Sequence, residues 1–538
     1  MEKRAFIAIL LSLLILVAWQ EWMSRFYPAP PEPQAPAQKE APQQSPPATP
    51  PAAELPPASA PSVPAPAHAA QSAKDITVDT DDYVAVFTTQ GARLKSFKFK
   101  HYRTSADDQS PPYELITAAP GVPFPLGMSW PAPAPFDDGT LLYGVSGGDM
   151  KLTGAAKGTL SFEGRGPDGS SAVKSFTFSG SGYQIQLETS VRSPAGGALT
   201  PELLLTEKSD HNVLNPDAPI EGLIALVDSK IKRENAVEPN KSVEFSGDIS
   251  WAGFGHTYFF FAALPDSSPQ HNLSLTNAGP ALIASLRANS GNGPQRYTLF
   301  AGPKEISILE AVGRGIEKSI DFGYFALISK PLLYLLHFSH RFTGSYGIDI
   351  ILLTILIKIL MAPLTHKSFV SMKQMQKLAP QMEKLKQKFK DDKEKLNKEI
   401  MELYRRNGVN PLGGCLPMAL QFPVFIGLYN ALSTPIELRH APFMWIKDLS
   451  QPDWKSLPFT VADWHLGIPV LTILMGASMF IQQWMTPSAG DPNQRRMMLM
   501  MPLIFTFMFV TFPAGLTIYW LVNNILSIAQ QYWINRQS

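Results

Sequence analysis

One lysine lies deep inside an otherwise apolar stretch of the chain. Lys358 sits in the run 349–361, whose other ionisable residue, Asp349, stands at its beginning. A lysine at the centre of a membrane-spanning helix costs roughly 2.5–3.5 kcal/mol on insertion scales, so it should face a partner or water. Thr354, one helical turn earlier, is expected on the same face. No acidic residue lies deep in another apolar stretch to pair with Lys358.

Two interpretations of this lysine follow, and the sequence leaves both open. The polar residues at Thr365 and His366 begin about seven residues, roughly 10 Å, beyond Lys358, so its long stem could snorkel towards them. Alternatively, the cation lies in a hydrated pocket. Uncharged polar residues in or near apolar stretches usually join helices, but beside an unpaired cation they could line a wet cavity. They are Gln421, Asn430, Gln482, Gln483, Asn523, Asn524, Ser527 and Gln530.

Motifs for covalent chemistry are almost absent from the sequence. The segment 144–148 reads GVSGG and fits G-x-S-x-G, but a turn and a strand are expected after it, where a nucleophile elbow needs a helix. There is no HExxH, no phosphate-binding loop and no cluster of histidines. The single cysteine, Cys415, excludes an intramolecular disulfide framework and a multi-cysteine metal site. We therefore expect no enzyme, cofactor or metal. One alternative remains, an intramembrane hydrolase that pairs Lys358 with Ser478 or Ser527.

The composition indicates several unlike segments joined in one chain. The 538 residues carry 46 basic and 45 acidic side chains, a balance that argues against a polyanion-binding surface over the whole chain. DNA is not expected as a partner. The mean hydropathy is −0.03. However, 15 of the 49 prolines lie in 28–67, and 15 of the 19 methionines follow residue 360. Proline-rich segments are typical of extended spacers, whereas methionines suit adaptable apolar surfaces.

The first 74 residues are expected to anchor and space the rest. An uninterrupted apolar run at 5–19 follows Lys3 and Arg4 and precedes interfacial aromatic residues. This pattern favours an uncleaved transmembrane anchor at 1–27 whose N-terminus stays in the cytoplasm. The proline-rich segment 28–74 is predicted to be a linker outside the membrane.

Residues 75–318 have the alternation of half-buried strands. Apolar and polar residues alternate at 83–87 and 175–178, and turn clusters such as 166–169 separate such stretches. About 240 residues suffice for one large all-β sandwich with its own core.

The remaining residues predict an α-helical membrane bundle. The segment 319–345 mixes apolar and basic residues as an amphipathic interfacial helix does. Within 346–538, five apolar segments are each close to the length that crosses a bilayer, and the last two are joined by a tight turn. The five spans are 346–365, 413–432, 466–485, 497–512 and 514–534.

The loop charges predict how these spans are oriented. The loop 366–406 carries 12 Lys/Arg against 6 Asp/Glu, and 486–496 carries Arg495 and Arg496. The positive-inside rule places both loops in the cytoplasm. With the anchor, six spans result, both termini are cytoplasmic and the β domain is outside. Apolar residues at helical spacing on both sides of a break at Asp391 and Asp392 predict a cytoplasmic helical hairpin at 366–410.

Several short motifs resemble the YidC family of bacterial membrane protein insertases, in its Gram-negative form, and together they span the whole chain. They are Ala301-Gly302-Pro303-Lys304, Pro363-Leu364-Thr365, Asn410-Pro411-Leu412-Gly413-Gly414-Cys415, Gln421-Phe422-Pro423-Val424-Phe425, Phe512-Pro513-Ala514-Gly515-Leu516 and Tyr519-Trp520.

The resemblance implies a fold and a set of site residues. The outer domain would be a periplasmic β-supersandwich, and the five-helix core would enclose a groove open to the cytoplasm and lipid but closed to the periplasm. Lys358 stands where the family usually has arginine, so a positive potential survives without the bidentate fork. Thr354 and Gln421 match other groove positions. Phe422, Phe425, Phe505, Met508, Tyr519 and Trp520 match or flank positions that contact a substrate helix.

The resemblance also implies partners and a location. The protein would insert and fold nascent membrane proteins in the bacterial inner membrane, alone or with the Sec translocon, SecYEG and SecDF. The ribosome would be a further partner through the cytoplasmic hairpin, and membrane lipids would surround the core. The alternative function is a secondary transporter with the polar intramembrane residues as its substrate site. Such a transporter usually shows repeated halves, and the five core spans with one basic hairpin show none.

Overall fold

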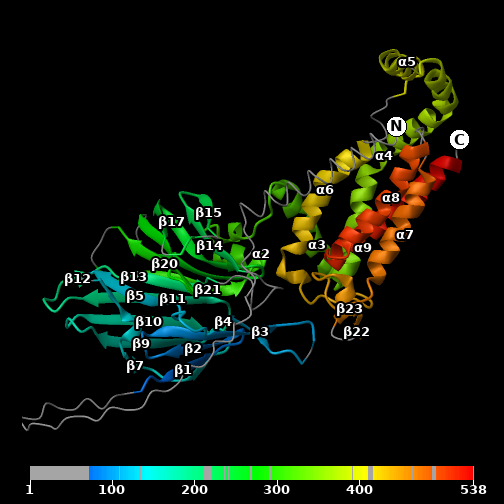
Figure 1. Ribbon diagram of the computed structural model, residues 1–538. Coiled ribbons are helices and arrows are strands. Elements are labelled where there is room, and N and C mark those ends of the chain that lie inside the picture. Colours follow the sequence, from blue (N-terminus) through cyan, green and yellow to red (C-terminus); the bar gives the residue numbers. More distant parts are fainter. Residues whose placement is uncertain are drawn as a thin grey trace, which may run out of the picture. The chain divides into compact units, whose positions relative to one another are not determined.

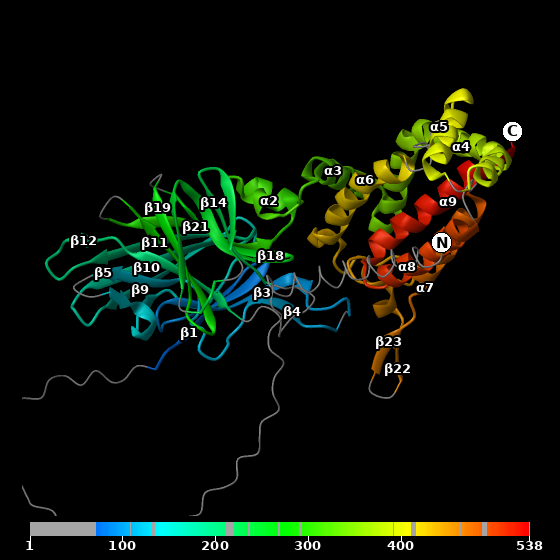
Figure 2. The same cartoon turned by 45° about the horizontal axis from the view of Figure 1, so that its top comes forward.

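The computed structural model describes residues 72–536 apart from short gaps, and it contains a β-sheet part followed by a helical part (Figures 1 and 2). The gaps are 108, 132–134, 210–219, 235–236, 240, 267–269, 290–292, 391, 410–415, 462–463 and 487–491. The expected anchor, most of the linker and Cys415 therefore lie outside the described residues.

Three sheets build the first part, which confirms the prediction of a β domain at this place in the chain. The largest has the order β15-β14-β17-β18-β21-β11-β10-β9-β7, with β12 paired to β11. Its strands are β7 (Gly144–Ser146), β9 (Lys157–Arg165), β10 (Ser171–Ser179), β11 (Gln184–Arg192), β12 (Ala198–Leu199), β14 (Ile220–Val227), β15 (Lys230–Glu234), β17 (Ile249–His256), β18 (Phe259–Pro265) and β21 (Gln295–Pro303).

Two smaller sheets complete this part. A six-stranded sheet has the order β16-β19-β20-β13-β5-β6, and a five-stranded sheet has the order β4-β3-β2-β1-β8. The first comprises β5 (Gly127–Pro131), β6 (Pro135–Asp137), β13 (Glu202–Lys208), β16 (Ser242–Gly247), β19 (His271–Asn277) and β20 (Ala281–Ala288). The second comprises β1 (Asp75–Asp79), β2 (Tyr83–Thr88), β3 (Arg93–Arg103), β4 (Pro112–Ile116) and β8 (Met150–Lys151).

The alternation of apolar and polar residues in the sequence matches the alternation of buried and exposed side chains along these strands. In β10 every second side chain is buried, and Phe176 lies opposite Leu160 of β9 and Leu187 of β11. The ring of Phe87 from β2 lies 4.8 Å from that of Phe176, centroid to centroid. Side chains of one parity therefore join two sheets in one core, as expected for packed sheets. The segment 144–148 enters this part through β7 and no helix follows it, which removes the nucleophile-elbow reading.

A buried charge network occupies one core position of β10. Lys174 is fully buried, and its Nζ lies 2.6 Å from an Asp138 carboxylate oxygen. The same ammonium donates to the carbonyls of Gly91 and Leu126, at 2.7 Å each. Arg93 also contacts Asp138, at 3.2 Å. Because every charge has a partner, the sheet tolerates a lysine at an inward-facing position.

The second part is mainly helical. Its packing centres on α9, which contacts α4, α7 and α6, while α8 packs on α7 and α3 packs on α6 and α4. The helices are α2 (Ile306–Val312), α3 (Ala326–Thr343), α4 (Tyr346–Lys388), α5 (Lys393–Arg406), α6 (Leu416–Ser433), α7 (Val470–Met485), α8 (Pro492–Phe509) and α9 (Ala514–Arg536). Short elements are η1 (Asp138–Thr140), η2 (Ile316–Ser319), η4 (Ile436–Leu438), η5 (Asp453–Ser456), β22 (Pro458–Val461) and β23 (Trp464–Gly467).

Helix α4 is continuous from its apolar half into its basic half. Among the described residues, it is the one helix both long and apolar enough to cross a membrane. Helix α7 and the part Met498–Phe509 of α8 are apolar but shorter. Asp392 then begins α5 by accepting a hydrogen bond from the backbone nitrogen of Lys395 at 3.0 Å. Helix α5 packs on the end of α4 through Leu378, Met382 and Tyr404.

A buried aspartate fixes the beginning of α7. The Asp453 carboxylate accepts hydrogen bonds from the Leu471 backbone nitrogen at 2.8 Å and from the Thr472 hydroxyl at 2.7 Å. Asp453 comes from η5, so it caps the helix from a distant segment. This cap satisfies one free backbone donor of the first turn and places a negative charge where the helix dipole favours it.

The Lys174→Met variant is expected to lower the free energy of unfolding of the β domain by about 3–5 kcal/mol, because buried Asp138 loses its ammonium partner and the carbonyls of Gly91 and Leu126 lose a donor. The measurement is thermal unfolding of the purified protein, with susceptibility of the β domain to proteolysis as the readout. Lys98→Met is the control, since the Lys98 side chain is half exposed and its Nζ lies 3.8 Å from Glu114. Its expected loss is below about 1 kcal/mol. Equal losses in both variants would contradict the prediction.

The β domain is expected to lose stability in mild acid through His271. This residue is fully buried, neither ring nitrogen has a hydrogen-bond partner among the described residues, and burial lowers its pKa below the usual 6.5. Below about pH 6.5 the unfolded state therefore binds more protons than the folded state, and the free energy of unfolding decreases as the pH is lowered. Hydrogen exchange of β19 at pH 7.5 and pH 5.5 measures the effect. His271→Leu should show a smaller fall, and His101→Leu, at an exposed histidine, should match the parent.

Candidate functional site

The ammonium group of Lys358 is held between α4 and α9. Its Nζ donates a hydrogen bond to the Ser527 hydroxyl at 2.5 Å, and it lies 3.5 Å from the amide oxygen of Asn523. Both partners belong to α9, and Lys358 is half-buried. Among the described residues, no carboxylate forms an ion pair with this ammonium. The ammonium is therefore bound by neutral acceptors, and no carboxylate among the described residues compensates its charge.

Other polar residues of α9 extend this contact along two faces of the helix. Towards α4, the Gln530 amide donates to the Thr365 hydroxyl at 3.0 Å. Towards α7, the Asn524 amide donates to the Ser478 hydroxyl at 3.0 Å, and Gln531 donates to the Met485 carbonyl at 2.7 Å. Such hydrogen bonds between apolar helices fix their register, because an unpaired polar group in an apolar medium is costly.

The three residues expected to line the groove are not all brought together. Gln421 of α6 donates to the Tyr519 hydroxyl of α9, which is buried. Thr354 is also buried, and its hydroxyl donates to the Ile350 carbonyl of its own helix at 2.6 Å. Lys358 turns to Ser527 and Asn523 instead. Gln421 and Lys358 thus both contact α9, whereas the Thr354 hydroxyl forms a hydrogen bond within α4.

Four aromatic rings from three helices form a cluster beside Gln421 and Tyr519. The rings of Phe425 and Trp520 lie 5.1 Å apart, and those of Phe505 and Trp520 are stacked at 6.4 Å. Phe509 completes the cluster, 5.2 Å from Trp520 and 6.2 Å from Phe425. The cluster joins α6, α8 and α9. The indole nitrogen of Trp520 is buried and has no hydrogen-bond partner among the described residues.

Two of the expected substrate contacts lie outside this cluster. Phe422 is 58% exposed and Met508 is 41% exposed. Their side chains are therefore available to lipid or to another apolar helix, whereas Phe425, Phe505, Tyr519 and Trp520 pack within the bundle.

Sequence reasoning did not single out Phe509, although a signal was present. Phe509 is fully buried, and it follows Phe505 by four residues, so the two rings share one helix face. The sequence offered Ser527 as a partner of Lys358 only in the hydrolase alternative, beside Ser478, and it gave Asn523 only as one polar residue among several.

The Ser/Lys hydrolase alternative requires a serine that contacts Lys358 and donates its hydroxyl hydrogen to it. The structure shows the contact but not this hydrogen bond. Ser527 does contact Lys358, yet its hydroxyl donates to the Asn523 carbonyl at 2.7 Å. A nucleophilic serine would have to donate to the lysine, which acts as the base. Ser478 donates to the Met475 carbonyl and accepts from Asn524, away from Lys358.

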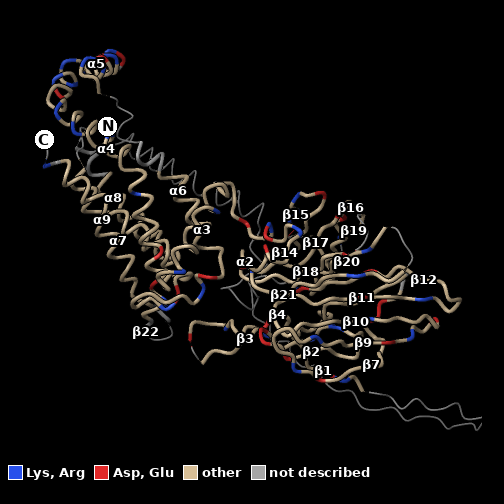
Figure 3. The backbone as a smooth tube through the Cα atoms, turned by 180° about the vertical axis from the view of Figure 1, so that it is seen from behind, with Lys and Arg blue, Asp and Glu red and all other residues tan. Residues whose placement is uncertain are grey.

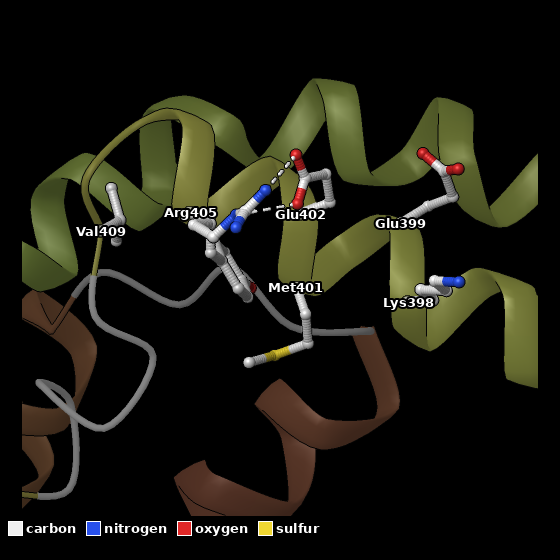
Figure 4. A pocket seen from close by; sticks show the side chains of 7 residues that line it. Lys398, Glu399, Met401, Glu402, Arg405 and Val409 are labelled. Carbon is white, nitrogen blue, oxygen red and sulfur yellow. Dashed lines mark hydrogen bonds and ion pairs between the residues drawn. The ribbon is translucent and has the colours of Figure 1, made fainter.

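A separate pocket of about 660 Å³ lies on α5 (Figure 4). Met401 is exposed at this pocket, while Tyr404 and Val409 are buried. Glu402 forms ion pairs with Arg405 and Arg406, both at 3.0 Å, so the polar rim is largely neutralised within the helix. Among the described residues, no group of histidine, cysteine and acidic side chains could hold a metal ion.

Two family models match consecutive parts of the chain from residue 75 onwards. The model described as 60Kd inner membrane protein matches residues 338–538, and the model of the YidC periplasmic domain matches residues 75–335. The chain belongs to the YidC family. The resemblance found in the sequence motifs is therefore confirmed.

Relatives of known name agree with this membership. The chain is 41% identical to the membrane protein insertase YidC of Citrifermentans bemidjiense, over 100% of this chain and 99% of that one. It is 40% identical to the insertase of Syntrophus aciditrophicus over the full length of both. The insertase of Geobacter sp. strain M21 is 42% identical over 86% of each chain. The chain is thus a YidC-type membrane insertase, not an enzyme, and the transporter alternative is not favoured.

A solved structure, an active YidC insertase with its first transmembrane domain resolved, is similar over 86% of this chain and 93% of that one. The sequence identity is 18% and the TM-score is 0.38.

Phe509→Ala is expected to destabilise the bundle by roughly 3 kcal/mol, because it opens a cavity between α6, α8 and α9. Thermal unfolding of the detergent-purified protein measures the change. Met508→Ala removes a neighbouring side chain that is not enclosed and is expected to cost less than half as much. A larger loss for Met508→Ala would show that α8 is oriented differently.

Proposed function

We propose that this chain inserts and folds nascent inner-membrane proteins through a groove that opens to the cytoplasm, with Lys358 as its cation. The observation that carries the proposal is the setting of Lys358, whose ammonium contacts two neutral oxygens and no carboxylate among the described residues. Such a group attracts an acidic segment of another chain, because no internal counter-ion cancels its charge.

The substrate is a nascent chain with a short acidic or polar N-terminal tail. The tail enters the groove and approaches Lys358, where low-dielectric surroundings strengthen the attraction of opposite charges. Water in the groove shortens the apolar barrier that the tail must cross. The membrane potential then favours outward movement of a negative charge by about 2.3 kcal/mol per 100 mV. No nucleotide is needed for this sequence of events.

The apolar segment of the substrate leaves the groove between α6 and α8. Exposed Phe422 and Met508 lie on these two helices, beside Phe425 and Phe505 of the aromatic cluster. Transfer of the segment into lipid releases roughly 0.8 kcal/mol for each CH₂ group that leaves water. Aromatic and methionine side chains suit this step because they accommodate segments of different shape.

The charge distribution supports an inner-membrane topology with six spans and two cytoplasmic termini. Lys and Arg residues are frequent on α5 and on the adjoining end of α4 (Figure 3). The positive-inside rule then gives a cytoplasmic hairpin at 366–410, an N-terminal anchor at 1–27 and a β domain in the periplasm. Helices α4, α6, α7, α8 and α9 are the five spans of the insertase core.

Helix α3 fits the membrane interface. It exposes Leu327, Phe338 and Phe342, while Leu332 and Leu336 are buried. An apolar exposed side together with basic residues is typical of a helix that lies at the lipid surface.

The partners follow from this placement. Nascent membrane proteins enter from the cytoplasm, alone or from the Sec translocon formed by SecYEG with SecDF. The basic hairpin is positioned for the ribosome or for anionic lipid head groups.

Lys358→Leu is expected to reduce insertion of acidic-tailed substrates at least tenfold in proteoliposomes with a membrane potential, because the attracting charge is lost. Lys358→Arg keeps the charge and is expected to retain most of the activity. Protease protection of the translocated tail measures insertion. If Lys358→Leu inserts such substrates as well as the parent does, the cation has no role.

A further inference from the structure

The ammonium of Lys358 is bound by the neighbouring helix α9. Its Nζ lies 2.5 Å from the Ser527 hydroxyl. Polar residues begin about seven positions further along α4, where a lysine stem could extend towards water. The contact with α9 holds the ammonium at Ser527.

The Ser527 hydroxyl is oriented to accept from this ammonium. It donates its own hydrogen to the Asn523 carbonyl at 2.7 Å, which leaves its lone pairs for Lys358. Ser527 is only 3% exposed, so water does not readily replace the lysine at this oxygen. The Asn523 side-chain oxygen, at 3.5 Å, lies on the same side of the ammonium. One turn of α9 thus presents two acceptors to one ammonium group.

These contacts offset part of the cost of placing a charge in an apolar medium. A charged group without acceptors is far more costly there than one with hydrogen bonds. If the acceptors are removed, the lysine lowers its energy by extending towards water at the membrane surface. The cation would then leave the depth at which it meets the tail of a substrate.

We propose that Ser527 and Asn523 are positioning residues that hold the Lys358 ammonium inside the span, as a neutral seat. The inference rests on the proposed role of Lys358 as the cation of the groove, and it names the residues that set where this cation acts. Because the seat is neutral, it holds the cation without cancelling its charge. An ammonium has three N–H donors. With two directed to the seat, the third is left for a substrate carboxylate.

The test compares substrates whose N-terminal tails carry zero, one, two or three acidic residues, inserted by the full-length protein in proteoliposomes. With the parent, insertion should rise with the number of acidic residues. Ser527→Ala should flatten this dependence and lower insertion of the most acidic substrate by about tenfold, the effect of losing one hydrogen bond to a charged group. Asn523→Ala should flatten it less, because its contact is longer. Ser527→Thr retains the hydroxyl and should preserve the dependence.

Asn524→Ala is the matched control. Asn524 lies on the same helix and is equally buried, but its amide contacts Ser478 of α7 rather than Lys358. This variant loses one contact between helices, as Ser527→Ala does, yet it should keep the dependence on tail charge. Insertion of the tail without acidic residues shows that each variant is folded.

A second measurement follows the lysine itself. A membrane-impermeant amine reagent, added to the cytoplasmic side and read by mass spectrometry of the peptide, should label Lys358 several-fold more in Ser527→Ala than in the parent or in Asn524→Ala. Ser527→Asp supplies an internal counter-ion and should abolish the dependence on tail charge.

The outcomes separate this proposal from the proposed function. Suppose that Lys358→Leu removes the dependence on tail charge while Ser527→Ala and Asn523→Ala both keep it. The positioning role of Ser527 and Asn523 is then wrong, and the role of Lys358 as the cation is retained. If Lys358→Leu itself keeps the dependence, both the role of Lys358 as the cation and the positioning role of Ser527 and Asn523 are wrong. A flattened dependence in Asn524→Ala equal to that in Ser527→Ala would show a general effect of loosening α9 and would overturn the seat.

Discussion

A charge that lies among apolar helices must be surrounded by oxygen atoms or reach water, and the helical part of this protein is arranged around that requirement. Lys358 meets it through α9, whose polar residues face α4 on one side and α7 on the other. Each of these hydrogen bonds fixes the rotation and height of α9 against a neighbour, because an unsatisfied polar group costs more in hydrocarbon than in water. Helix α9 is therefore both the support of the cation and the central element of the bundle.

The aromatic cluster complements this polar seam. Phe425, Phe509 and Trp520 pack between α6, α8 and α9 without hydrogen bonds to one another, while Gln421 and Tyr519 provide the polar contact next to them. Helix contacts are dense around α9, while exposed apolar side chains are found on α4, α6, α7, α8 and α9. The bundle therefore combines a closely packed interior with an apolar outer surface, as expected for helices that contact lipid.

Much of this organisation could be predicted from the sequence, since it depends on local patterns. The alternation in β2 and β10 indicated a β domain, and the long apolar runs and short motifs indicated a membrane insertase. What the sequence could not give was the pairing of distant residues. Lys358 and Ser527 are 169 positions apart, and no periodicity encodes which faces of α4 and α9 meet. Lys174 shows the same limit, because its core position becomes acceptable only through Asp138 from another segment.

Helix α4 is one rod of 43 residues, about 65 Å long at 1.5 Å per residue. Lys358 lies in its apolar half, and the segment that packs against α5 lies in its basic half. A continuous helix couples the positions of its two halves, except where proline removes a helical hydrogen bond and allows a bend. Pro363 and Pro380 are the two such points, and both lie between Lys358 and the end of the helix. In the topology proposed above, the stiffness of α4 at these two prolines sets how far a contact on the hairpin displaces Lys358.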